Sequence, residues 1–114
     1  PLGKAFNVLT LMYRSDIVNR IANTMRCEGT FLIQNKCGLH ARAATVLAQL
    51  AVKFDADITL YQDEKEAAGD SVLALLLLES SQGKYVKIRC EGPDAKSALS
   101  AIGDLIEQKF HEQE

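Results

Sequence analysis

The sequence predicts one α+β domain in which a layer of helices covers one face of a β-sheet. Segments in which apolar and polar residues alternate, as in strands, occur among segments whose apolar residues recur every three or four positions, as in helices. The resulting order is β-α-β-β-α-β-α. The 114 residues, 47% of them hydrophobic, suffice for one core but not for two. Because an amphipathic layer must bury its apolar side, we expect an antiparallel or mixed sheet with helices on one face.

The first half of this pattern predicts one helix between strands. Residues 30–34 are expected to form a buried strand that ends at a polar turn, residues 35–38. Residues 41–53 are expected to form an amphipathic helix, because its apolar positions follow helical spacing: Ala44, Leu47, Ala48, Ala51 and Phe54. Residues 56–61 alternate as a half-buried strand does, and a weaker strand near residues 66–68 completes a hairpin.

The second half adds a short helix, a strand and a long helix. Ser71 precedes an apolar run, residues 72–78, that fits either a buried strand or a small helix. We favour the helix, because Ser is a preferred N-cap and Leu and Ala form helices well. Residues 85–91 alternate clearly as a strand. Pro93 then opens a helix with this apolar face: Ala95, Leu99, Ile102, Ile106 and Phe110.

Composition narrows the class of protein. Lys and Arg total 13 against 15 Asp and Glu, a net charge of -2, which argues against a general nucleic-acid binder. The three cysteines lack CxxC spacing and accompany only two histidines, so neither a disulfide framework nor a metal site is expected, and a reducing cytoplasm fits best. No apolar run is long enough to span a membrane. We therefore expect a soluble protein with no cofactor and no membrane insertion.

Residues 1–26 differ from the rest of the chain. They begin with Pro1-Leu2-Gly3, which suggests a processed or expression-derived end, and a short helix is expected around residues 17–25. We therefore expect residues 1–26 to be an N-terminal extension and residues 27–114 to be the domain.

A candidate reactive residue, His40, lies at the entrance of the helix predicted from residue 41. A neutral imidazole is a capable nucleophile toward phosphorus. Free backbone N–H groups and the positive end of the helix dipole, beginning at Ala41, both favour a bound phosphoryl group. Arg42 adds a planar set of donors suited to phosphate oxygens. These residues alone fit an ordinary surface pair as well as a phosphoryl site.

Two motifs resemble one family. The stretch from Gly38 to Ala44, Gly-Leu-His-Ala-Arg-Ala-Ala, resembles the active-site signature of the HPr family of histidine-containing phosphocarriers, of the bacterial phosphotransferase system. Residues 70–80 resemble the family's regulatory-serine helix, and Ser71 follows His40 by the family's 31 positions (71 minus 40). The wording of this second motif is most similar to the nitrogen-related branch, NPr. The resemblance runs from about Cys27 to Phe110.

The resemblance implies an open-faced β-sandwich of four antiparallel strands covered on one face by three helices. It also implies a relay in which Enzyme I, charged by phosphoenolpyruvate, phosphorylates His40 at Nδ1, and His40 passes the group to an EIIA-type acceptor. Arg42 and Ala41 would bind the phosphate. Ser71 would be open to phosphorylation by an HPr kinase/phosphorylase, besides capping its helix.

Two positions depart from the family pattern, and they leave an alternative open. Ala43 stands where most members have proline, and Cys37 stands where some have asparagine, so the rate of transfer is in question. The alternative is a regulatory binding module of the same fold that acts through Ser71 or through docking, without phosphate relay. Because the run after Ser71 cannot all face inward, its exposed side chains are expected to mark a docking surface. The expected docking residues are Thr45, Val72, Leu73 and Leu76.

Overall fold

The computed structural model describes residues 25–112 and has the expected order of elements. The strands are β1 (Arg26–Leu32), β2 (Asp57–Gln62), β3 (Lys65–Ala68) and β4 (Tyr85–Glu91). The helices are α2 (Ala41–Ala51), α3 (Val72–Leu77) and α4 (Ala95–Glu107), followed by a 3-10 turn, η1 (Lys109–His111). The four strands form one antiparallel sheet in the order β1-β4-β2-β3. The open-faced α+β fold predicted from the sequence is confirmed.

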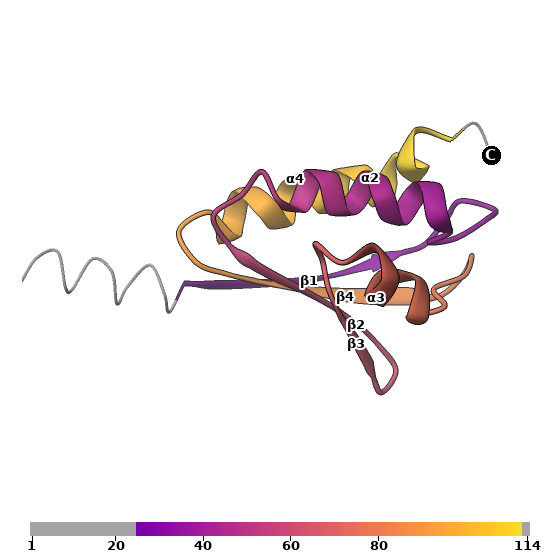
Figure 1. Cartoon of the computed structure of the whole chain (residues 1–114), viewed down its shortest axis with the longest axis horizontal. Coiled ribbons are helices and arrows are strands. Elements are labelled where there is room, and N and C mark those ends of the chain that lie inside the picture. Colours follow the sequence, from indigo (N-terminus) through magenta and orange to yellow (C-terminus); the bar gives the residue numbers. More distant parts are fainter. Residues whose placement is uncertain (1–24, 113–114) are drawn as a thin grey trace, which may run out of the picture.

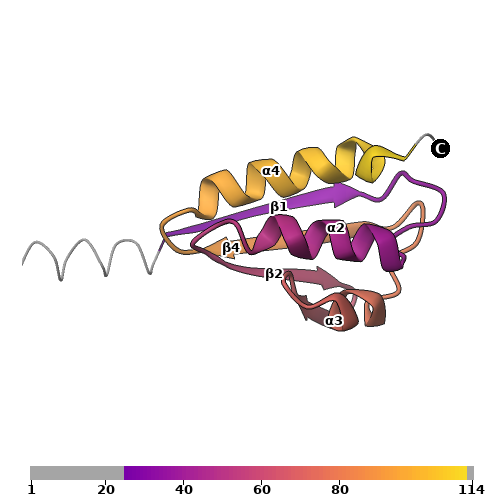
Figure 2. The same ribbon diagram turned by 45° about the horizontal axis from the view of Figure 1, so that its top comes forward.

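One face of the sheet carries the helices. Helices α2 and α4 lie next to each other over β1 and β4, and the shorter α3 packs against α2 and β3 (Figures 1 and 2). Burial alternates along the central strand β4, where Val86, Ile88 and Cys90 are buried and Lys87 is exposed. The core therefore lies between this face and the helices, and α2 carries its first residue to one end of the layer.

Strand β1 begins earlier and ends earlier than the sequence predicts. Its inward positions include Cys27 and Gly29, whose small side chains weaken the apolar alternation. The space is filled by Phe31, because a Cβ on Gly29 would lie 3.0 Å from the ring and a Cβ on Gly103 would lie 2.5 Å from it. The apolar alternation of β1 is therefore weak, because two glycines, Gly29 in the strand and Gly103 in α4, leave the space that Phe31 fills.

Residues 72–77 form helix α3, as predicted in preference to a strand. Its N-cap is Ser71, whose Oγ accepts a hydrogen bond from the backbone N–H of Ala74 at 3.2 Å. Helix α2 ends at Ala51, two residues before the predicted boundary, where Val52 and Lys53 close a turn.

The C-terminal end corrects the sequence prediction. Helix α4 stops at Glu107, so Phe110 does not belong to its apolar face. Instead Lys109, Phe110 and His111 all have positive φ angles, between 55° and 63°. This reversal costs backbone energy at three non-glycine residues, and it is offset in part by Phe110, which is fully buried. The chain is thereby turned back toward the first residue of α2.

Residues 1–24 lie outside the described part of the chain, and with them most of the helix expected at residues 17–25. Strand β1 begins at Arg26, within the segment assigned to the extension. Between residues 25 and 112, no helix has the length and apolar character needed to cross a membrane.

Candidate functional site

His40 is the N-cap residue of α2. Its backbone is extended (φ -80°, ψ -178°), and its carbonyl accepts the first hydrogen bond of the helix, from Ala44 N–H at 2.8 Å. Its side chain does not cap the helix, and it is about one third exposed (32%). The imidazole therefore lies at the positive end of α2 and makes no capping hydrogen bond to the helix.

The turn before His40 rests on the loop that follows α3. The backbone N–H of Leu39 donates to the carbonyl of Ser80 at 2.8 Å. Gly38 has a φ of +62°, and a Cβ on it would collide with the same Ser80 carbonyl oxygen. Only glycine meets both conditions, so Gly38 sets the close approach that fixes the backbone entering His40.

Arg42, in the first turn of α2, points to the C-terminal reversal. Its Nη2 donates to the carbonyl of Phe110 at 2.9 Å and to Glu112 Oε2 at 2.7 Å. Both contacts use Nη2, which leaves the N–H groups of Nη1 and Nε for an incoming oxyanion. About half of the Arg42 side chain is exposed (49%). Arg42 thus joins two segments of the chain while remaining open to solvent.

Glu112 is the centre of this cluster. Its Oε2 lies 2.5 Å from His40 Nε2, and its Oε1 accepts a hydrogen bond from Asn35 Nδ2 at 3.0 Å. With Arg42, three donors converge on one carboxylate, whose side chain is only 16% exposed. Among residues 25–112, Glu112 is the one hydrogen-bond partner of the His40 ring. These donors are all directed at one carboxylate that the chain itself supplies.

The electrostatics of Glu112 follow from these contacts. Burial by itself raises the pKa of this carboxyl, but hydrogen bonds from His40, Arg42 and Asn35 outweigh burial and lower the pKa from 4.5 to about 2. A carboxyl whose pKa is lowered in the folded state adds stability above its ordinary pKa. That stability is lost as the pH falls from about 4.5 toward 2.

We therefore predict a pH-dependent difference between the wild-type protein and Glu112→Gln. At pH 7 the wild type is expected to be more stable, by up to about 3 kcal/mol, because only the carboxylate gains from the positive donors. As the pH falls from about 4.5 to 2 the difference should shrink, and near pH 2 the two free energies of unfolding should approach each other. Denaturant titrations at several pH values measure both proteins. A difference that stays constant down to pH 2 would contradict the assignment of the low pKa to Glu112.

The other residues singled out from the sequence lie on α2 and at the start of α3. Thr45, one turn into α2, donates its hydroxyl to the Ala41 carbonyl at 2.7 Å and is half-buried. Ser71 is half-buried at the start of α3. The structure brings His40, Ala41 and Arg42 together in the first turn of α2, whereas Ser71 belongs to a separate helix packed on α2.

Helix α3 exposes apolar side chains. Leu73 is 69% exposed and Leu76 is 36% exposed, while Leu75 is fully buried. Val72, expected with them, is half-buried and packs against the core. Leu77, which the sequence analysis did not single out, is 64% exposed. Its signal was its position in a six-residue helix that can bury only one side.

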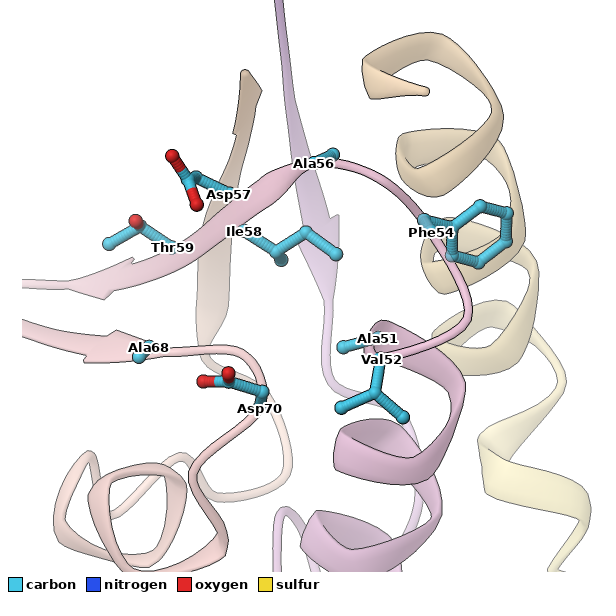
Figure 3. A pocket seen from close by; sticks show the side chains of 9 residues that line it. All are labelled: Ala51, Val52, Phe54, Ala56, Asp57, Ile58, Thr59, Ala68 and Asp70. Carbon is cyan, nitrogen blue, oxygen red and sulfur yellow. The ribbon is translucent and has the colours of Figure 1, made fainter. Parts of the chain in front are cut away.

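A pocket of about 460 Å³ lies at the opposite end of α2. It is lined by Ala51 and Val52 at the end of that helix, by β2 residues including Asp57, and by Asp70 (Figure 3). The eleven residues of α2 place it roughly 15 Å from the helix entrance. None of the residues singled out for phosphoryl chemistry lines it.

Two residues of the His40 cluster were missed by the sequence analysis. The sequence predicts Asn35 only as part of a polar turn, but its side chain is fully buried and its Nδ2 also donates to the Gly38 carbonyl at 2.7 Å. Glu112 lies in a polar tail, and its position depends on the reversal after α4. No local sequence pattern marks Glu112. For Asn35, the one available signal was that a polar side chain lies in the turn just before His40.

The sequence of this chain is similar to that of a known family and of several characterised proteins. Residues 27–108 match the family described as "PTS HPr component phosphorylation site". The phosphocarrier protein NPr of Shewanella violacea is 52% identical over 87 residues, which cover 76% of this chain and 96% of that protein. NPr of Escherichia coli K12 is 40% identical over 89 residues, covering 77% and 99%.

A solved structure agrees with these relatives. The crystal structure of HPr-C-His from Thermoanaerobacter tengcongensis superposes with a TM-score of 0.74 at 42% identity. The match covers 77% of this chain and 99% of that one. Sequence and fold therefore point to the same group of proteins.

Proposed function

The chain belongs to the HPr family of phosphotransferase-system phosphocarriers, in its NPr branch, and from that premise we propose that His40 carries the phosphoryl group. The observation that carries this proposal is the convergence of donors at the entrance of α2, where His40 lies beside Arg42. The partly exposed imidazole, the guanidinium and the helix N-terminus bring a nucleophile, a phosphate ligand and a favourable dipole to one place.

The transfer reaction needs no further group on this chain. The lone pair of His40 Nδ1 attacks phosphorus, the P–N bond forms, and the bond to the donor breaks with its electron pair leaving on the donor. Arg42 and the backbone N–H groups from Ala41 onward stabilise the charge on the transferred oxygens. In the discharge step the acceptor attacks phosphorus, and the P–N electron pair returns to Nδ1.

We infer that the phosphoryl donor is Enzyme I, charged by phosphoenolpyruvate, and that the acceptor is an EIIA-type protein. Both are the partners that the family resemblance implies. We place the relay in the cytoplasm, consistent with the free thiols of Cys27, Cys37 and Cys90. We further propose that residues 27–114 form the carrier domain and that residues 1–26 are an extension.

Labelling of the wild-type protein tests the proposed function. With phosphoenolpyruvate and Enzyme I, the chain is expected to take up label that is lost in acid and retained in base, as phosphohistidine behaves. Label that survives acid, added by an HPr kinase at Ser71, would instead favour a regulatory binding module. Ser71 is half-buried and its hydroxyl oxygen accepts the N-cap hydrogen bond, so we rank the regulatory binding module as the second candidate function. No label with active Enzyme I would refute the carrier.

We propose that α3 docks the partners through Leu73, Leu76 and Leu77, together with Thr45 and the partly covered Val72. Helix α3 packs on α2, and the loop after α3 contacts the turn before His40, so the apolar side chains lie on elements joined to the site. A partner that buries these side chains gains the free energy of removing them from water.

Leu73→Ala is expected to raise the KM of phosphoryl transfer from Enzyme I by about tenfold without changing the melting temperature. The side chain is mostly exposed in the free protein, so its truncation costs binding, about 1–2 kcal/mol, and not folding. Val52→Ala is the matched control, because Val52 is equally exposed (67%) but lies at the far end of α2. Initial rates over a range of carrier concentrations measure both variants. Equal KM values for the two would contradict docking through α3.

A further inference from the structure

The clearest feature not used by the proposed chemistry is the pair formed by Asn35 and Glu112. These residues are 77 positions apart and come from the turn after β1 and the reversal after α4. Glu112 contacts the His40 ring at Nε2 and not at Nδ1, and Asn35 contacts Glu112.

A carboxylate next to one ring nitrogen decides where the proton of a neutral imidazole lies. Glu112 is ionised at neutral pH and can only accept hydrogen bonds. Nε2 must therefore carry the proton, and Nδ1 is left with its lone pair. Buried carboxylates that hold a histidine in one tautomer act in this way in acyl-transfer sites.

Asn35 fixes the carboxylate and the approach to His40 at once. Its single amide nitrogen, Nδ2, donates to Glu112 Oε1 at 3.0 Å and to the Gly38 carbonyl at 2.7 Å. The side chain is fully buried, and its Oδ1 finds no partner among the described residues. A buried amide that leaves one atom unsatisfied pays a desolvation cost. The two hydrogen bonds that Asn35 donates offset part of this cost, and they join the turn before His40 to the C-terminal segment.

We propose that Asn35 and Glu112 form a positioning pair for His40, in which Asn35 holds Glu112 and Glu112 accepts the Nε2–H, so that Nδ1 faces the phosphoryl donor. The proposal rests on the carrier function proposed above. During transfer the Nε2 proton stays on the ring. As the P–N bond forms at Nδ1, the ring becomes cationic, and the Glu112 carboxylate stabilises that charge. Discharge returns the electron pair to Nδ1 and leaves a neutral ring with the same proton on Nε2.

The experiment uses the full chain labelled with ¹⁵N, because the shifts of the two ring nitrogens of His40 report which one carries the proton. The wild type is expected to show Nε2 protonated and Nδ1 unprotonated in the neutral ring. Glu112→Ala should give a mixture of tautomers and lower the rate of phosphorylation by about tenfold. Glu112→Gln keeps a neutral acceptor and should retain the tautomer while losing most of the rate. Glu107→Ala, on the exposed end of α4, is the matched control and should change neither.

Asn35 is tested through Glu112. Asn35→Ala is expected to shift the tautomer and slow transfer in the wild-type background, but to add little in Glu112→Ala, because the pair acts as a unit. If Asn35→Ala does not fold, the Glu112 variants alone decide. An unchanged tautomer and rate in Glu112→Ala would overturn the pair while leaving the carrier function intact. A wild type that takes no label, with tautomers that still shift as expected, would refute the carrier and keep the pair.

Discussion

His40→Ala is expected to abolish phosphoryl uptake from phosphoenolpyruvate and Enzyme I, by far the largest effect expected of any substitution in this chain. The imidazole is the only nucleophile that the cluster at the start of α2 offers, since Arg42 is cationic and Glu112 is engaged by three donors. Truncation should not unfold the domain, because the His40 side chain makes no capping hydrogen bond. Loss of label with an unchanged circular dichroism spectrum is the expected result.

The chain supplies its own control for this experiment, because it contains one other histidine. His111 is exposed in the turn η1, and His111→Ala should keep its label at near the wild-type rate. Label that persists in His40→Ala and disappears in His111→Ala would reverse the assignment. Label that persists in both would move the chemistry to another type of residue.

Arg42→Ala is expected to lower the rate of transfer by about 10²–10³-fold. A donor aimed at charge that develops on transferred oxygens contributes most in the transition state, so the loss should appear in kcat more than in KM. Arg42→Lys should recover part of the rate, because it keeps the charge but not the planar pair of donors. Rapid-quench measurements with Enzyme I separate the two constants.

Arg42 also joins α2 to the Phe110 carbonyl, so its effect on stability must be measured alongside its effect on rate. Arg26→Ala is a suitable control, since Arg26 is similarly exposed (53%) and pairs with Glu91 at 3.5 Å on the sheet. It should leave kcat unchanged. A fall in kcat for Arg42→Ala that is matched by a loss of folded protein would contradict a direct role in transfer.

Most of the fold was predictable because its elements carry strong local patterns. Strand β4 was predicted at the bounds observed, residues 85–91, from strict alternation of apolar and polar side chains. Ser71 marked the start of α3, because a hydroxyl cap satisfies a free N–H group at a helix start. The bounds of β1 were wrong because its inward residues are small and depend on the ring of Phe31 and on Gly103 in α4.

The site was predictable only in its sequence-local half. The positions of His40 and Arg42 in one helical turn follow from the sequence around them and from the family motif. Glu112 reaches them only because three residues after α4 take positive φ angles, a conformation that no residue there favours by itself. Periodicity instead placed Phe110 on α4, although its buried ring serves to hold the reversal.

Phosphoryl transfer through His40 is tested most directly by identifying the atom that carries the phosphoryl group. The wild-type protein, labelled with ¹⁵N and charged by Enzyme I and phosphoenolpyruvate, can be observed by phosphorus NMR while the phosphoryl group is bound. We expect a single phosphorus signal coupled to Nδ1 of His40, with the proton still on Nε2 beside Glu112. A signal coupled to Nε2, to His111 or to no nitrogen at all would contradict it.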